Sequence, residues 1–79
     1  MPYEVDDAAF WAQFPADAEP WIRPQVSRKI AEIKRLADPR SQGGEYRGKW
    51  AYTSGKLHIL AVIDDGARCV RLLKLLRLP

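Results

Sequence analysis

His58, the only histidine of the sequence, lies in the apolar run LHILAVI and carries the side chain best suited to proton transfer. An unperturbed imidazole titrates near pH ~6.5, so it can act as a general base or a general acid at neutral pH. Basic residues surround it, since residues 40–79 hold eight lysines and arginines against three acidic residues. Such a basic half suggests a polyanionic partner, either nucleic acid or an acidic protein. The alternative is solvated surface charge that keeps a small domain soluble.

Other chemistries find little support in the composition. One histidine and one cysteine, Cys69, do not make a tetrahedral metal site, so we expect no metal and no cofactor. A lone cysteine cannot form an internal disulfide, which fits a reducing cytoplasm. No signal peptide or membrane-spanning run is visible, so we expect a cytoplasmic protein without a membrane contact. The length predicts a single domain, residues 1–79.

The elements that position these residues are predicted from spacing and turn residues. Apolar residues recur in a helical pattern over residues 22–36, which predicts an amphipathic helix. A short strand at residues 3–5 and a short helix from Asp6 or Asp7 to Phe14 precede it. Residues 38–46 are predicted as a loop. Three strands follow, at residues 47–53, 57–63 and 67–75, and the turns between them are predicted at Ser54-Gly55 and Asp65-Gly66.

The predicted order is β-α-α-β-β-β, an α+β fold with both helices on one face of an antiparallel sheet. Two-residue turns would place Leu60 opposite both Lys49 and Arg71, and His58 in the next row opposite Ala51. The face toward the helices is predicted to carry Trp50, Tyr52, Leu57, Ile59, Ala61, Ile63, Val70 and Leu72. The other face would carry Lys49, Ala51, Thr53, Lys56, His58, Leu60, Val62, Arg71 and Leu73, with Arg77 next in phase. His58 would then lie diagonally beside Lys49 and Arg71, or on an ordinary solvated sheet face.

The stretch YRGKWAYTSGKLHILAVIDDG, with DPR before it, resembles the RelE/ParE superfamily of toxins from bacterial type II toxin–antitoxin systems. The shared features are a Gly-x-Trp that opens a strand, a glycine turn, an apolar strand and an acidic hairpin. The resemblance implies a RelE-like fold and a cognate antitoxin as partner. In the RelE-like branch it also implies an endoribonuclease that cleaves mRNA on the ribosome, with the 2′-hydroxyl attacking the adjacent phosphate.

The resemblance also implies roles for particular residues. Lys49 matches a lysine that contributes to cleavage, and His58 stands where the pattern G-x-x-R-[ILV] has an arginine. Arg77 lies near a C-terminal arginine of the family. Lys49, His58 and Arg77 are therefore the expected catalytic residues, and Arg47, Lys56 and Arg71 are the expected RNA-binding residues.

Two departures from the family pattern leave other functions open. Ala51 replaces a residue that is often basic in the RNA-cleaving branch, and neither G-[HK]-R nor a tyrosine follows Arg77. The alternatives are a ParE-like poison of DNA gyrase and a non-catalytic relative that acts only as a binding module. A dense apolar run near the C-terminus is expected to bind the partner, through Leu72, Leu73, Leu75, Leu76 and Leu78.

Overall fold

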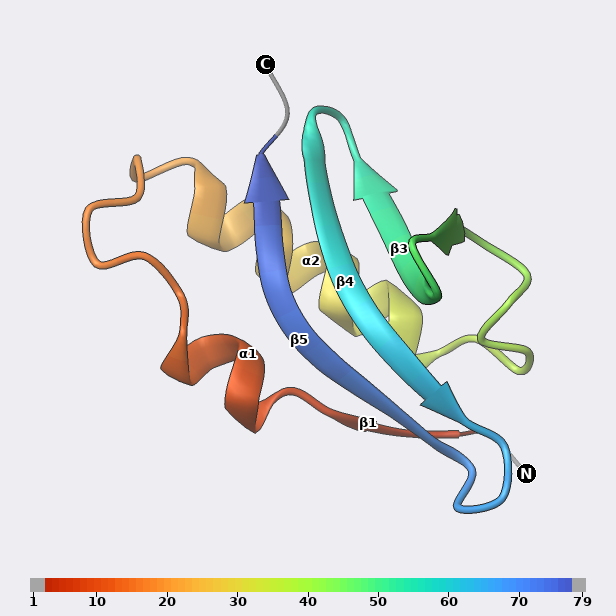
Figure 1. The fold of residues 1–79 in the computed structure, drawn as a ribbon. Coiled ribbons are helices and arrows are strands. Elements are labelled where there is room, and N and C mark those ends of the chain that lie inside the picture. Colours follow the sequence, from red (N-terminus) through yellow and green to blue (C-terminus); the bar gives the residue numbers. More distant parts are fainter. Residues whose placement is uncertain (1–2, 78–79) are drawn as a thin grey trace.

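The computed structural model describes residues 3–77, which form two helices and a five-stranded sheet. The elements are β1 (Glu4–Asp6), α1 (Ala8–Ala12), α2 (Ile22–Lys34), β2 (Gly44–Tyr46), β3 (Lys49–Ser54), β4 (Leu57–Asp64) and β5 (Cys69–Arg77). The strand order across the sheet is β1-β5-β4-β3-β2. All neighbours are antiparallel except β1, which runs parallel to β5. Figure 1 shows α2 crossing behind the sheet and α1 beside β5. The predicted α+β fold is confirmed, with one strand more than expected.

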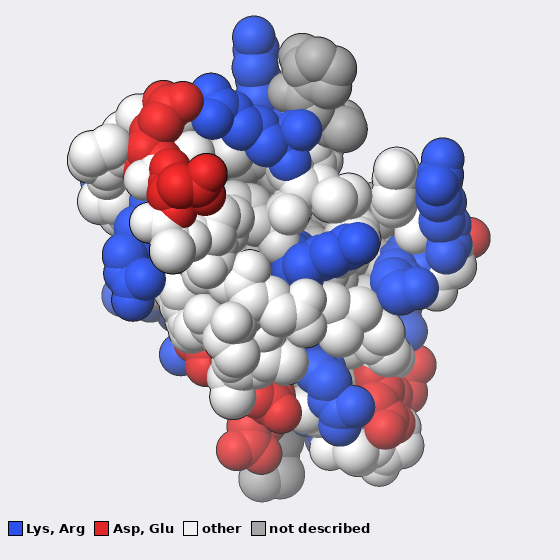
Figure 2. Space-filling view, turned by 60° about the vertical axis from the view of Figure 1, so that its left-hand side comes forward, with Lys and Arg blue, Asp and Glu red and all other residues white. Residues whose placement is uncertain are grey.

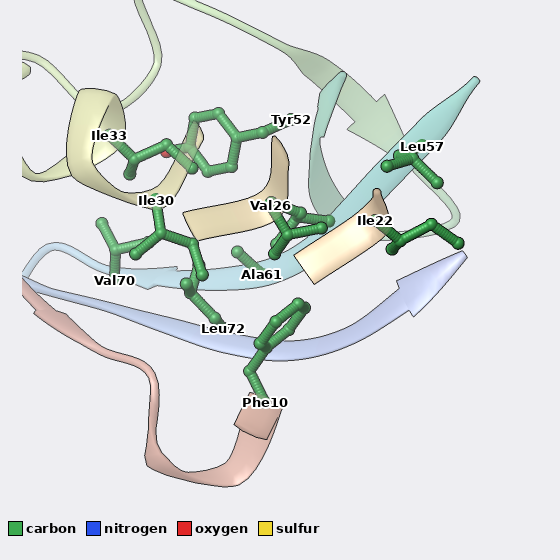
Figure 3. Close-up of a cluster of buried hydrophobic side chains, with 11 residues drawn as sticks. Phe10, Ile22, Val26, Ile30, Ile33, Tyr52, Leu57, Ala61, Val70 and Leu72 are labelled. Atoms are coloured by element: carbon green, nitrogen blue, oxygen red, sulfur yellow. The ribbon is translucent and has the colours of Figure 1, made fainter. Parts of the chain in front are cut away.

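The hydrophobic core lies between α2 and the sheet, as the spacing of apolar residues predicted. Four residues of α2 are buried because they recur on one side of the helix: Ile22, Val26, Ile30 and Ile33. They contact the predicted inner face of the sheet, and α1 adds Phe10 (Figure 3). The buried residues of that face are Tyr52, Leu57, Ile59, Ala61, Val70 and Leu72. Burying one such large side chain stabilises the fold by about 1.5–3 kcal/mol.

The short helix α1 ends two residues earlier than predicted. Its first amide is bonded by an aspartate, because the Ala8 N–H donates to Asp6 Oδ1 at 3.1 Å. After Ala12 the chain tightens, since the Gln13 and Phe14 amides donate to carbonyls three residues back, both at 3.2 Å. Phe14 therefore packs against the core from a tightened turn beyond the helix.

The edge strand β2 was not predicted, because residues 38–46 were expected to form a loop. Arg47 and Gly48 form the turn between β2 and β3, with φ of 49° and 79°, so β3 begins at Lys49 rather than at residue 47. Two inner-face aromatic residues of β3 hold the preceding segment in place. The Tyr52 hydroxyl donates to the Pro39 carbonyl at 2.6 Å, and the Trp50 indole donates to the Gln42 carbonyl at 2.8 Å.

Both hairpin registers differ from the prediction by two residues. The β3–β4 turn consists of Gly55, with φ of 63°, and Lys56, so Ala51 lies opposite Leu60 instead of His58. The β4–β5 turn has four residues, 65–68, and Arg68 takes a φ of 50°. Because side chains alternate with period two, a shift of two residues keeps each side chain on its predicted face.

A β-bulge in β5 then reverses the faces of the residues that follow it. The register shifts between Leu60 and Ala61 of β4, so that Ala61 lies opposite Leu72 while Leu60 lies opposite Lys74. Leu73 is the extra residue. Lys74 consequently shares a face with Leu60, and Arg77 lies opposite Leu57, a core residue.

The bulge also changes the interpretation of the C-terminal leucines. Leu72 is fully buried and is not available to a partner, whereas Leu75 is half-buried and packs against the core. Leu73 and Leu76 are half-buried, and Leu78 lies outside the described residues. The predicted partner surface is wrong for Leu72, because its side chain lies in the hydrophobic core between the sheet and the helices.

Candidate functional site

The sheet surface away from the core, called the open face below, brings His58 and three basic residues together. Its members are Tyr46, Lys49, Ala51, Thr53, His58, Leu60, Val62, Arg71, Lys74 and Leu76. They form three rows across the strands: Lys49 and Arg71 flank Val62, Ala51 and Lys74 flank Leu60, and Thr53 and Leu76 flank His58. The open face is therefore basic at its rim and apolar along its middle strand.

The imidazole of His58 is half-buried in this surface. Its Nδ1 lies 3.4 Å from Thr53 Oγ1 across the β3–β4 pair, and within residues 3–77 no other hydrogen bond engages the ring. Lys74 occupies the adjacent row, whereas Lys49 and Arg71 lie two rows away, about 13 Å along the strand. The expectation that Lys49 and Arg71 are diagonal neighbours of His58 is wrong, because the β3–β4 turn lies one residue further along the chain and the β4–β5 turn is two residues longer than predicted. The sequence reasoning missed Lys74, which only the bulge brings to this face.

The basic side chains of this region carry charge that no acidic group neutralises closely. Among the described residues no carboxylate pairs with any of Arg47, Lys49, Lys56, Arg71 and Lys74. The acidic residues of the same face are Glu4 and Asp6 of β1 and Asp64 of β4; Asp6 is aligned with Arg71, and Glu4 and Asp64 flank Cys69 in the row beyond it. Figure 2, in which the α1 side of Figure 1 comes forward, shows basic side chains across the centre and right, and most acidic atoms at the upper left and lower edge. A polyanion on the open face would meet cations on both sides of the apolar middle strand.

Arg47 and Lys56, two of the expected RNA-binding residues, sit in the hairpin turns at opposite ends of β3. Arg47 places its guanidinium 5.5 Å from the centre of the Tyr46 ring, and Lys56 follows Gly55 in the turn that precedes His58. Both are exposed. They add one positive charge beyond each end of the three rows of the open face.

Arg77 lies on the other side of the sheet. Its guanidinium pairs with the Glu19 carboxylate at 2.9 Å and lies 5.5 Å from the centre of the Trp21 ring. The expected grouping of Arg77 with Lys49 and His58 is wrong, because the bulge turns Arg77 toward the loop between α1 and α2. Within the open face, Lys74 occupies the place that was expected for a C-terminal cation.

A second charged cluster, at the β4–β5 turn, is structural. Asp65 accepts two bonds from Arg40, at 2.8 and 3.0 Å, and one from the Tyr3 hydroxyl at 2.5 Å. These bonds, those from Arg40 first, lower the pKa of Asp65 to about 2. The same carboxylate raises the pKa of Tyr3. The cluster ties β1 and the segment after α2 to the turn.

Residues 3–77 contain no group of three or more histidine, cysteine, aspartate or glutamate side chains that could hold a metal ion. Neither α1 nor α2 has the length and apolar composition to cross a membrane.

Comparison with known proteins identifies the fold. The sequence matches no protein-family model and no curated protein. A chain of the toxin–antitoxin complex RelBE2 from Mycobacterium tuberculosis superposes with a TM-score of 0.75 at 21% identity, covering 99% of this chain and 100% of that one. A chain of the intact E. coli RelBE toxin–antitoxin complex gives 0.69 at 17% identity, covering 98% of each chain. Over nearly its whole length, therefore, this protein has the RelE-like fold that its sequence predicted.

Proposed function

We propose that this chain is the toxin of a type II toxin–antitoxin system and that its open face cleaves mRNA on the ribosome. The observation that supports this proposal best is the half-buried imidazole of His58, with Lys74 in the adjacent row. Two rows away lie Lys49 and Arg71, neither of which pairs with a carboxylate among the described residues. Support for the class comes from the two similar chains, both of which belong to RelBE toxin–antitoxin complexes. The antitoxin, the ribosome and mRNA are the partners that this proposal names.

The proposed chemistry assigns a step to each group. His58 takes the proton of a ribose 2′-hydroxyl, the 2′ oxygen bonds to the adjacent phosphorus, and the bond to the 5′ oxygen breaks. Lys74 stabilises the additional negative charge of the phosphorane. The leaving 5′ oxygen takes a proton from water, and the hydroxide so formed takes the proton from His58, which leaves a 2′,3′-cyclic phosphate and a 5′-hydroxyl end. Lys49 and Arg71 lie two rows from His58, too far to contact the reacting phosphate. They therefore bind a neighbouring phosphate of the same strand. The 2′-hydroxyl requirement restricts the reaction to RNA.

Primer extension on mRNA from cells that express the chain tests this proposal. We expect cuts in phase with codons, and we expect His58→Ala to reduce cleavage by about 10²–10⁴-fold, the usual contribution of a general base. Lys74→Ala should reduce cleavage more than Lys49→Ala, since Lys74 lies one row nearer to His58. The matched control is Lys34→Ala on α2, whose ammonium pairs with Asp7 at 3.7 Å, away from the open face.

Two results would contradict the assignment. An absence of codon-phased cuts, or cuts unchanged in the double variant of Lys49 and His58 to alanine, refutes the nuclease. Arg77→Ala tests the register separately: a loss as large as that of His58→Ala would contradict its placement against Glu19.

A ParE-like gyrase poison is the second candidate. It is favoured by Ala51, which places no charge beside Leu60, and by Arg77, which faces away from His58. Accumulation of gyrase–DNA cleavage complexes with intact mRNA would select this function over the nuclease. Normal growth on overexpression would select the non-catalytic binding module.

The antitoxin partner has its own test. A cationic open face should attract an acidic segment of the partner. We expect the protein encoded next to this one to co-purify with it, and we expect Lys49→Glu with Arg71→Glu to weaken the complex, measured by titration at low and high salt. Affinity that is unchanged by charge reversal would place the contact elsewhere.

A further inference from the structure

The open face contains an apolar hollow beside His58, the proposed general base. It has a volume of about 50 Å³ and is lined by Tyr46, Ala51, His58, Leu60 and Leu76. The hollow forms because Gly44 of β2, which has no side chain, lies opposite Ala51 of β3. This cross-strand pair therefore fills little space on the open face. The larger neighbours become walls, and Leu60 and Leu76 form the part of the wall nearest β5.

The occupant can be inferred from the lining and from the surrounding charge. Three of the five lining side chains are aliphatic, and the other two are the rings of Tyr46 and His58. Tyr46 is 37% exposed, and the Arg47 guanidinium lies 5.5 Å from the centre of its ring. Flat rings beside an arginine are the surfaces on which unpaired bases stack, and cations beside them bind the phosphates. An acidic or purely aliphatic ligand would leave one of these two features unused.

We propose that the hollow between Tyr46 and His58 binds one unstacked nucleobase of a single-stranded RNA. The proposal rests on RNA being the substrate of the open face, and it adds a base-binding site to the phosphate contacts. The hollow is small, with a volume of about 50 Å³. It therefore admits one edge of the base, while the face of the base covers the Tyr46 ring. Phosphates on either side of this base then lie near Lys49 and Lys74.

A variant can fill the hollow without touching a cation. A Cβ at Gly44 would meet no heavy atom within 4 Å, and its φ is not in the left-handed region, so Gly44→Leu is tolerated by the backbone. Its side chain would project from the open face beside Ala51. Ser27→Leu is the matched control, because Ser27 is exposed on α2. Tyr46→Ala removes the stacking surface instead of blocking it.

Fluorescence anisotropy with 2′-O-methyl hexaribonucleotides measures binding apart from cleavage, because these probes lack the attacking hydroxyl. One probe carries all its bases, and six others each carry one abasic position. We expect one abasic position to weaken binding by about tenfold, the usual order for loss of one stacked base. Gly44→Leu and Tyr46→Ala should weaken binding of the complete probe to a similar extent. Each variant should then bind the complete probe and the abasic probe equally well. The salt dependence should stay unchanged, because the phosphate contacts remain.

The outcomes separate this proposal from the nuclease. Equal binding of all seven probes, wild-type affinity in Gly44→Leu, or no binding of any probe by the folded protein overturns the base site, whatever the cleavage assay gives. Base-dependent binding without ribosomal cleavage refutes the nuclease and leaves the base site standing. If Gly44→Leu weakens only the binding of the antitoxin, the occupant is a protein side chain and the base site is wrong.

Discussion

Replacing Tyr52 with phenylalanine tests how the segment that carries β2 is held against the sheet. The Tyr52 side chain is fully buried, and its hydroxyl donates to the Pro39 carbonyl at 2.6 Å. Tyr52→Phe removes the donor and leaves a buried acceptor unsatisfied, which costs about 1–3 kcal/mol. For a domain of this size each kcal/mol lowers Tm by about 4–8 °C.

The same hydroxyl gives the prediction a characteristic pH dependence. Burial raises the pKa of Tyr52 to about 12, against 10.0 for an ordinary tyrosine. The folded state therefore keeps the proton that the unfolded chain releases, and wild-type stability falls as pH rises above 10. From these two pKa values the loss is less than about 1 kcal/mol at pH 10 and about 1 kcal/mol at pH 11. Tyr52→Phe lacks this loss, so its disadvantage relative to wild type should shrink across this range.

Urea unfolding followed by tryptophan fluorescence at pH 8, 10 and 11 measures both effects. Tyr46→Phe is the control, since the Tyr46 hydroxyl makes no hydrogen bond within residues 3–77 and its loss should change stability by less than about 0.5 kcal/mol. Equal stability of Tyr52→Phe and wild type at pH 8 would refute the tether. A difference that stays constant from pH 8 to pH 11 would refute the raised pKa.

Three further predictions concern the fold. Gly43→Ala should destabilise the domain by at least about 1–3 kcal/mol in urea, because Gly43 has a φ of 83° and a Cβ there would lie 2.3 Å from a β3 carbonyl oxygen; Gly44→Ala next to it should be neutral or slightly stabilising. Phe10→Ala should cost about 3–5 kcal/mol in the same assay, since its ring is buried in the core. The Arg40 bonds lower the pKa of Asp65 to about 2, so wild type should lose stability between about pH 4 and pH 2 relative to Asp65→Asn, measured as urea midpoints; parallel curves would contradict this.

The elements that carry a long periodic signal could be predicted from the sequence. The apolar spacing of α2 fixed its buried side, and alternation in β3 and β4 placed Trp50 and Tyr52 toward the core rather than in an RNA site. These assignments depend on which residues leave water, and burial is encoded along the whole element. The side chains of β3 and β4 lie on their predicted faces although the predicted pairing was wrong, because both hairpin registers were shifted by two residues and side chains alternate with period two.

The turns could not be placed as well, because one or two residues decide them. Gly55 supports a turn as its first or its second residue, and the structure uses it as the first, with Lys56 second. The dipeptide Asp65-Gly66 suggested a two-residue turn, yet Asp64 Oδ1 accepts the Ala67 amide at 3.1 Å within a four-residue turn. The edge strand β2 had a usable signal, since a glycine after Arg47 permits a tight turn between two short extended segments.

The bulge in β5 decides which cations belong to the candidate site, and no residue type marks it. Up to Leu72 the strand alternates as predicted, and from Lys74 onward every side chain is exchanged between the two faces. One inserted residue thus gives His58 a lysine in the adjacent row and removes Arg77 to the loop that precedes α2. Resemblance by sequence position had favoured Arg77, whereas pairing across the sheet favours Lys74. A comparison of Lys74→Ala with Arg77→Ala therefore tests the bulge and the proposed cleavage site in one experiment, because the observed register predicts the larger loss for Lys74→Ala and a strand without the bulge predicts the larger loss for Arg77→Ala.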